Sequence, residues 1–287
     1  MEKQVLLSHG ISFRWLNSQC VEFRFPNGKY LLTDPFYFVD AGEKQEEIAP
    51  YLLPDFSVDD LEGADYIILN HAHGDHIGNL EEVAKKFGSK VICHTSIAAE
   101  IANTMDIPLT SIYPVDFGDT YYMNDFTLMT FHGEHHGQSW TWKDCMEDRN
   151  PFDISGRTDR LHTLGGIFNM NFLLILPGGL RIGFVGGNDD GMSKRFETLC
   201  PNVVFRNKVN SSKHMDHVAD DWFRFMKGAN AQIVVPMHHE TWLYKWPGLS
   251  EQAFADANRM AEEAGLSCRI LTPERKQWYS LDMTIYT

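Results

Sequence analysis

Residues 70–79 read Asn70-His71-Ala72-His73-Gly74-Asp75-His76-Ile77-Gly78-Asn79, and they follow the apolar run Tyr66-Ile67-Ile68-Leu69. Three histidines and one carboxylate therefore stand within six residues. Imidazole nitrogens and carboxylate oxygens bind divalent metal ions at about 2.0–2.2 Å, so several such side chains must converge on one point. A polar loop whose histidines face water is the alternative. Four ligand-type residues at this spacing favour the metal site.

The regular elements around this stretch are expected to hold it in place. A strand that ends at Leu69 would leave the histidines on a strand-to-helix connection. Leu80, Val83, Ala84 and Phe87 then recur at helical spacing, which predicts an amphipathic helix that ends near Gly88. The candidate ligands thus lie between two elements of regular structure.

Composition limits the classes of function. The chain has 287 residues, 43% of them hydrophobic, and no low-complexity linker, which predicts one domain over residues 1–287. Its formal net charge is -14, and it has no basic tract. This charge argues against nucleic acid as a partner, because nucleic-acid binding requires neutralisation of phosphates. A small anionic substrate remains compatible, since bound metal ions supply local positive charge.

Cysteine use and hydropathy indicate the compartment. The five cysteines are odd in number and widely spaced, without a CxxC pair, which predicts free thiols in a reducing environment. We find neither the apolar core of a signal peptide nor a run of about eighteen apolar residues, so we expect no transmembrane segment. The sequence therefore predicts a cytoplasmic protein and leaves its oligomeric state open, a homo-oligomer included.

The spacing His71-x-His73-x-Asp75-His76 resembles the HxHxDH signature of the metallo-β-lactamase fold superfamily, and the resemblance covers nearly the whole chain. Leu32-Thr33-Asp34-Pro35-Phe36 and Val234-Val235-Pro236-Met237-His238 are similar to the branch that includes L-ascorbate-6-phosphate lactonases and N-acyl-phosphatidylethanolamine phospholipases D. The resemblance implies an α+β fold, a four-layer αββα sandwich of two mixed sheets face to face with helices outside. It also places a metal site at one edge of the sandwich.

A first metal ion is implied for the paired histidines and a later one. His71 and His73 would supply two ligands. The third comes from a histidine a few residues past a later strand, and His135 fits that offset best. His136 is the next candidate and His132 the last.

A second metal ion is implied for the Asp-His pair and the last histidine of the pattern. These residues are Asp75, His76 and His238, whereas His239 is expected to point elsewhere. Asp34 ends a predicted strand nearby and could accept the free N–H of a ligating histidine. A turn-initiating role of Asp34 before proline is the alternative.

The carboxylate that would bridge the two ions departs from the family pattern. The family usually has Gly-Asp directly after this strand, whereas this chain reads Gly186-Gly187-Asn188-Asp189-Asp190-Gly191. We predict that Asp189 bridges, because the two glycines give the backbone freedom to present it. Asp190, Asn188 or an ordinary surface turn are the alternatives. Without a bridge, the site would hold one tight and one weak metal ion.

Residues 139–169 form a long connection that we predict to be a lid or binding insertion. Arg157 and Arg160 could pair with a phosphate or carboxylate of the substrate. Salt bridges to Asp153 and Asp159 are equally compatible with the sequence.

The ligand set predicts hydrolysis. A divalent ion lowers the pKa of bound water from 15.7 to about 7, and a second ion polarises the scissile bond. Asp75 would orient the metal-bound hydroxide and take up its proton. We therefore predict a metal-dependent hydrolase of a small lactone, ester or phosphorylated sugar, with one or two divalent ions. Zinc is the first expectation for their identity, and manganese and iron also suit the ligands.

Two other functions compete with this hypothesis. One is a phosphodiesterase of the phospholipase D type. The other is a di-iron redox protein, which would need an external electron donor because the chain has no flavodoxin-like extension. A non-catalytic binding module is disfavoured by the retained ligands.

Overall fold

The computed structural model describes residues 4–37, 55–135, 161, 164–187, 190–207, 217–239 and 248–286. Most of the insertion predicted over residues 139–169 lies outside these ranges, including Arg157 and Arg160. Its role as a lid stays a prediction, and so does the assignment of one domain to residues 1–287.

Two seven-stranded sheets organise the described part of the chain. The first sheet consists, in spatial order, of β14 (Tyr279–Tyr286), β1 (Gln4–Asn17), β2 (Cys20–Arg24), β3 (Tyr30–Thr33), β4 (Tyr66–Ile68), β5 (Lys90–His94) and β6 (Ile112–Val115). The second consists of β13 (Arg269–Ile270), β12 (Ile233–Met237), β11 (Val203–Asn207), β10 (Arg181–Val185), β9 (Met170–Ile175), β8 (Thr127–His132) and β7 (Thr120–Tyr122). Each sheet is mixed: β14-β1-β2-β3 and β10-β9-β8-β7 pair antiparallel, while β3-β4-β5-β6 and β10-β11-β12-β13 pair parallel.

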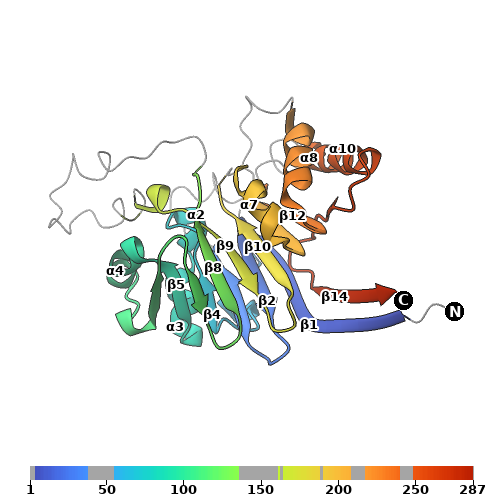
Figure 1. Cartoon of the computed structure of the whole chain (residues 1–287). Coiled ribbons are helices and arrows are strands. Elements are labelled where there is room, and N and C mark those ends of the chain that lie inside the picture. Colours follow the sequence, from blue (N-terminus) through green and yellow to red (C-terminus); the bar gives the residue numbers. More distant parts are fainter. Residues whose placement is uncertain are drawn as a thin grey trace.

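Helices cover the outer faces of both sheets (Figure 1). The first sheet packs against α3 (Leu80–Phe87) and α4 (Thr95–Thr104), and the second packs against α7 (Met192–Leu199), α8 (Val218–Ala229) and α10 (Leu249–Glu263). The described residues also include α2 (Gly74–Ile77), a helical stretch over residues 164–167, and the short 3-10 turns η3 (Val58–Asp60) and η4 (Leu109–Ser111). The predicted αββα sandwich is therefore confirmed.

Local sequence explains the helix that follows the histidine stretch. Leu80, Val83 and Ala84 are buried on one face of α3, as their spacing predicts. Its last turn ends at Gly88 with φ 61°, a left-handed conformation that glycine adopts without a steric penalty. The predicted end of the helix is confirmed.

Aromatic side chains fill the layer between the sheets. The Phe205 ring is stacked on Phe184 with centroids 5.0 Å apart, and it meets Phe13 edge-on at 5.1 Å and Phe23 edge-on at 5.4 Å. Phe13, Phe23 and Phe205 are fully buried. Residues from β1, β2, β10 and β11 thus lock the two sheets together.

Two features of the first sheet were not predicted. β14 pairs antiparallel with β1, and both strands extend away from the sandwich in Figure 1. A β-bulge between Ser8 and Ile11 interrupts their register.

Among the described cysteines, Cys20, Cys93, Cys200 and Cys268 are free, as predicted. No helix in the described ranges combines the length and the apolar character needed to cross a membrane.

We expect Phe205→Ala to destabilise the fold by roughly 3–5 kcal/mol, because truncating a buried phenylalanine removes apolar contacts and leaves a cavity. Chemical denaturation monitored by circular dichroism measures this loss. Tyr122→Ala is the matched control, since Tyr122 is 85% exposed and its truncation should change stability by less than about 0.5 kcal/mol. Equal effects of the two substitutions would contradict the assigned core.

Candidate metal centre

The loop after β4 carries four of the candidate ligands. Leu69 N donates to Ile92 O at 3.0 Å, which extends the parallel pairing one residue past the strand. Asn70 N then donates to Asp34 Oδ1 at 2.7 Å, and the chain turns away from the sheet. His73 is the N-cap residue of the single helical turn α2, and His76 N donates to His73 O at 2.9 Å. This geometry places two histidines before the turn and the Asp-His pair within it.

The structure brings together the three histidines predicted for the first ion. One ligand atom from each of His71, His73 and His135 lies within 4.8 Å of the others. His135 Nε2 is 3.0 Å from His73 Nδ1, and the ring centroids of His71 and His135 are 5.0 Å apart. His71 and His73 are buried, and His135, three residues past β8, is half-buried.

The three residues predicted for the second ion form a second group. Ligand atoms of Asp75, His76 and His238 also lie within 4.8 Å of one another. His238 Nε2 is 3.0 Å from Asp75 Oδ2, and His76 Nε2 is 3.9 Å from Asp75 Oδ1. His238 directly follows β12 with φ 55°, an uncommon left-handed conformation for a residue with a side chain.

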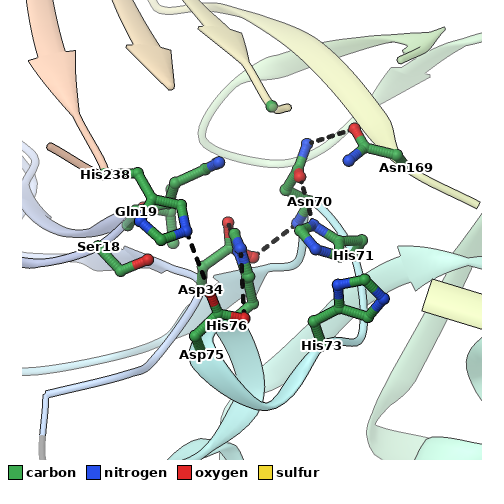
Figure 2. Close-up of polar contacts among 12 residues, drawn as sticks. Ser18, Gln19, Asp34, Asn70, His71, His73, Asp75, His76, Asn169 and His238 are labelled. Atoms are coloured by element: carbon green, nitrogen blue, oxygen red, sulfur yellow. Dashed lines mark hydrogen bonds and ion pairs between the residues drawn. The ribbon is translucent and has the colours of Figure 1, made fainter. Parts of the chain in front are cut away.

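The two groups adjoin. The ring centroids of His71, in the first group, and His76, in the second, are 3.8 Å apart, so the two groups are in contact through these two side chains. Figure 2 shows His71 and His73 on one side of the centre, His238 on the other, and Asp75 and His76 between them. Such an arrangement can hold two cations close together.

Electrostatics favour the metal-binding forms of these side chains. Burial, reinforced by neighbouring His76 and His73, holds the pKa of His71 well below its usual value, so the imidazole is neutral at pH 7. Burial raises the pKa of Asp75, but His76 and the hydrogen bond from His238 outweigh that effect and hold it well below the usual range. Neutral imidazole and ionised carboxylate are the forms that bind metal ions.

The orientation of His71 tests whether the site suits a metal ion. Its Nδ1 lies 2.7 Å from Asn70 Oδ1, an acceptor, so Nδ1 carries the proton and Nε2 carries the lone pair. His71 Nε2 is buried and has no hydrogen-bond partner within the described part of the chain. His76 Nδ1 lies 3.2 Å from the Asp34 carboxylate, and its Nε2 lies 3.9 Å from Asp75 Oδ1. A buried imidazole lone pair held in this way fits a divalent cation.

Asn70 is a residue of this centre that the sequence analysis did not single out. Its Nδ2 contacts Met170 O and lies 3.3 Å from Asn169 Oδ1, while its Oδ1 faces His71. In the sequence, its position could have been noticed, because an amide side chain stands at the end of the predicted strand, directly before His71. Asn70 thus orients His71 through contacts to the other sheet.

The other candidate ligands either lie outside the described residues or have a different position or partner in the structure. His136, Asn188 and Asp189 lie outside the described residues. His132 is exposed at the end of β8, and His239 is buried and stacked on Trp15 with ring centroids 4.9 Å apart. The Asp190 carboxylate contacts the buried guanidinium of Arg206, an ion pair that gives it a structural partner.

The end of β10 approaches the centre closely. A Cβ on Gly186 would lie 1.8 Å from Asn70 Nδ2, and one on Gly187 would lie 2.0 Å from Glu134 O and 3.3 Å from His135 Cα. Only glycine allows this approach. The chain therefore reaches the histidines two residues before Asp189.

We expect His71→Ala and His135→Ala to lose at least one metal ion per chain, because each removes one of three ligands from the first group. Elemental analysis of the purified variants measures the stoichiometry. His132→Ala and His136→Ala should retain the content of the unaltered protein. Full retention in both His71→Ala and His135→Ala would contradict the assignment, and loss in His136→Ala alone would move the third ligand by one residue.

Comparison with known proteins agrees with this architecture. Residues 14–139 match the Metallo-beta-lactamase superfamily. A UPF0173 metal-dependent hydrolase of Carboxydothermus hydrogenoformans is 24% identical over 252 residues, which cover 86% of this chain and 90% of that protein. Another, from Shouchella clausii, is 33% identical over 121 residues, 42% of this chain. That match spans 46% of the Shouchella protein. A match to a UPF0173 metal-dependent hydrolase of Thermodesulfovibrio yellowstonii spans 32% of the Thermodesulfovibrio protein. The chain therefore covers less than half the length of each of these two relatives.

Solved structures show the same fold. The isothiocyanate hydrolase from Delia radicum gut bacteria superposes with a TM-score of 0.64 at 17% identity, over 94% of this chain and 98% of that protein. With the matched family, this likeness shows a metallo-β-lactamase fold.

Proposed function

We propose that this chain, a member of the metallo-β-lactamase superfamily, is a metal-dependent hydrolase of a small lactone, ester or phosphorylated sugar. The observation that carries the proposal is the pair of adjoining ligand groups, which meet where His71 and His76 lie 3.8 Å apart by ring centroids. Its relatives among the UPF0173 proteins are named metal-dependent hydrolases, which supports the same class of reaction.

In this proposal, each group holds one divalent ion. His71, His73 and His135 would hold the first, and Asp75, His76 and His238 the second. Zinc is our first assignment, because the set combines several imidazoles with few carboxylates, and manganese and iron are the alternatives. Asp189 is assigned as the bridging carboxylate, supported by the approach of Gly187 to His135.

The ions would supply Lewis acidity, which activates water and polarises the scissile bond. The protein contributes orientation. Asp75 is an anionic carboxylate whose Oδ2 is 3.0 Å from His238 Nε2, so its position is defined. From there it can accept a hydrogen bond from the attacking water and take up its proton. Asn70 holds His71 in the tautomer that this role requires, and the Asp34 carboxylate lies 3.2 Å from His76 Nδ1.

The substrate class rests on sequence resemblance and on charge. The segments that end in Asp34-Pro35 and His238 are similar to those of the lactonase branch. Both segments contribute to the second group, through Asp34 beside His76 and through His238 itself. We therefore favour lactones and phosphorylated sugars as substrates.

The test is hydrolysis by protein that has been stripped of metal and reloaded with zinc, manganese or ferrous iron. The panel contains lactones, phosphorylated sugar lactones, simple esters and phosphodiesters. We expect at least one lactone or ester to be hydrolysed only in the metal-loaded state, and chelation to abolish turnover. Equal rates of hydrolysis with and without metal would contradict the proposal. Turnover of phosphodiesters alone would show that the substrate is a phosphodiester and not a lactone, an ester or a phosphorylated sugar.

Within this assay, Asp75→Asn should lower kcat by roughly 100-fold or more, because the neutral amide cannot accept the proton from water. Asp106→Asn is the matched control, since its side chain is 90% exposed and pairs with Lys85 at the surface. We expect Asp106→Asn to keep full activity. An unchanged kcat in Asp75→Asn would remove Asp75 from the mechanism.

The bridge is tested by a pair of substitutions. Asp189→Asn should lower the metal content from two ions per chain to one, because two nearby cations repel without an anion between them. Asp190→Asn should keep both ions and lower the Tm, because buried Arg206 loses its anionic partner. Metal loss in Asp190→Asn alone would shift the bridge by one residue. Retention of both ions by both variants would show that neither residue bridges.

A further inference from the structure

The turn between β1 and β2 reaches the second ligand group. Figure 2 shows Ser18 and Gln19 beside His238 and Asp34, on the side of the centre away from His73. His238 N donates to Ser18 O at 3.0 Å, so the turn is joined directly to the loop that carries this candidate ligand.

Hydrogen bonds hold the backbone of this turn. Trp15 Nε1 also donates to Ser18 O at 3.0 Å, and Thr33 Oγ1 donates to Gln19 O. Ser18 has φ 44°, and the neighbouring His238 has φ 55°. Non-glycine residues in the left-handed region are strained, and such strain concentrates at functional sites. The turn is therefore a rigid support for its side chains.

The side chain of Gln19 has an unused donor. Gln19 is 2% exposed, and its Nε2 is buried without a hydrogen-bond partner among the residues that the structure describes. Ser18 is fully buried, and its Oγ is likewise unpaired there. A buried amide without a partner is unfavourable for stability. A ligand that supplies an acceptor would remove this cost.

The surroundings define the chemistry of that ligand. The carboxyl groups of Asp34, which contacts His76, and of Asp75, which contacts His238, belong to the second ligand group, so an incoming anionic oxygen meets negative charge there. An amide N–H offsets this repulsion without adding a proton that titrates. Metal ions alone attract anions without fixing their direction, whereas an N–H group also orients the acceptor.

We propose that Gln19 is a substrate-binding residue whose Nε2 donates a hydrogen bond to a carbonyl, carboxylate or phosphoryl oxygen held over the Asp75, His76 and His238 group. The proposal rests on the proposed function, because it places the substrate at the second ligand group. It assigns part of the recognition to the first hairpin, outside the histidine motif.

Two substitutions separate the donor from the shape of the side chain. Gln19→Met keeps the length and removes the donor, and Gln19→Glu keeps the shape and replaces the donor with an anionic oxygen. Gln252→Met is the control, because Gln252 is exposed on α10, where its Nε2 contacts Asp256.

The first readout is the stability of the metal-free protein. We expect Gln19→Met to leave its Tm unchanged or to raise it by about 2–4 °C, because the substitution removes an unpaired buried amide. A purely structural role of Gln19 predicts the opposite sign. A clear decrease in the Tm of Gln19→Met would overturn the proposal.

The second readout is binding of inorganic phosphate and acetate to the zinc-loaded protein. We expect the side-chain amide signal of Gln19 in the NMR spectrum, assigned by its loss in Gln19→Met, to move when a probe binds. The affinity for that probe should fall roughly 10- to 100-fold in Gln19→Met and further in Gln19→Glu, with no change in Gln252→Met. The probe that loses more affinity identifies a carboxylate or a phosphoryl group as the favoured acceptor.

The third readout is kcat/KM on any substrate that the panel identifies, which should fall by a similar factor in Gln19→Met. If turnover occurs but Gln19→Met keeps wild-type kcat/KM and probe affinity, the inference fails and the proposed function stands. If no panel member is hydrolysed while probe binding depends on Gln19, the proposed function fails and the anion contact stands. An amide signal that neither probe moves also overturns the inference.

Discussion

The hydrogen bonds of Asn70 join the two sheets at the edge where the candidate ligands meet. Met170 N donates to Asn70 O at 2.8 Å, and the Asn70 side chain contacts Met170 O on the second sheet and Asn169 directly before it. The same side chain accepts from His71 Nδ1 at 2.7 Å. The ligands after β4 belong to the first sheet, whereas His135 and His238 follow strands of the second. Their convergence depends on this joint, and Gly186 is required because any side chain there would collide with Asn70.

The aromatic core makes that joint possible. Phe205 packs on Phe184 within its own sheet and against Phe13 and Phe23 of the other, and this dense contact fixes the distance between the layers. Loops at the edge of a rigid sandwich can present side chains with little freedom. A preorganised ligand set of this kind is what selective metal binding needs.

Several features of the centre are unfavourable for the stability of the fold. It buries His71 with an Nε2 that has no hydrogen-bond partner among the described residues, and it holds Ser18, Asp34 and His238 in the left-handed region. It also buries Gln19 Nε2, which has no hydrogen-bond partner among the residues that the structure describes. Such departures from the ordinary rules of folding concentrate at functional sites, because a site optimised for stability alone would leave nothing for a ligand to satisfy.

The sequence by itself determined the local part of this centre. The spacing of His71, His73, Asp75 and His76 places four ligand-type side chains on one turn, and the periodicity of α3 predicts the helix that holds them. The αββα sandwich followed from resemblance, as did the choice of His135 and His238. The tertiary structure decided the rest, because the decisive contacts join distant residues: Asn70 meets Asn169 across 99 positions, and Asp75 meets His238 across 163. No local pattern encodes such pairs, since only the packing of the two sheets brings them together. For that reason the tautomer of His71, the contacts of Asn70 and the placement of Gln19 emerged only from the folded chain.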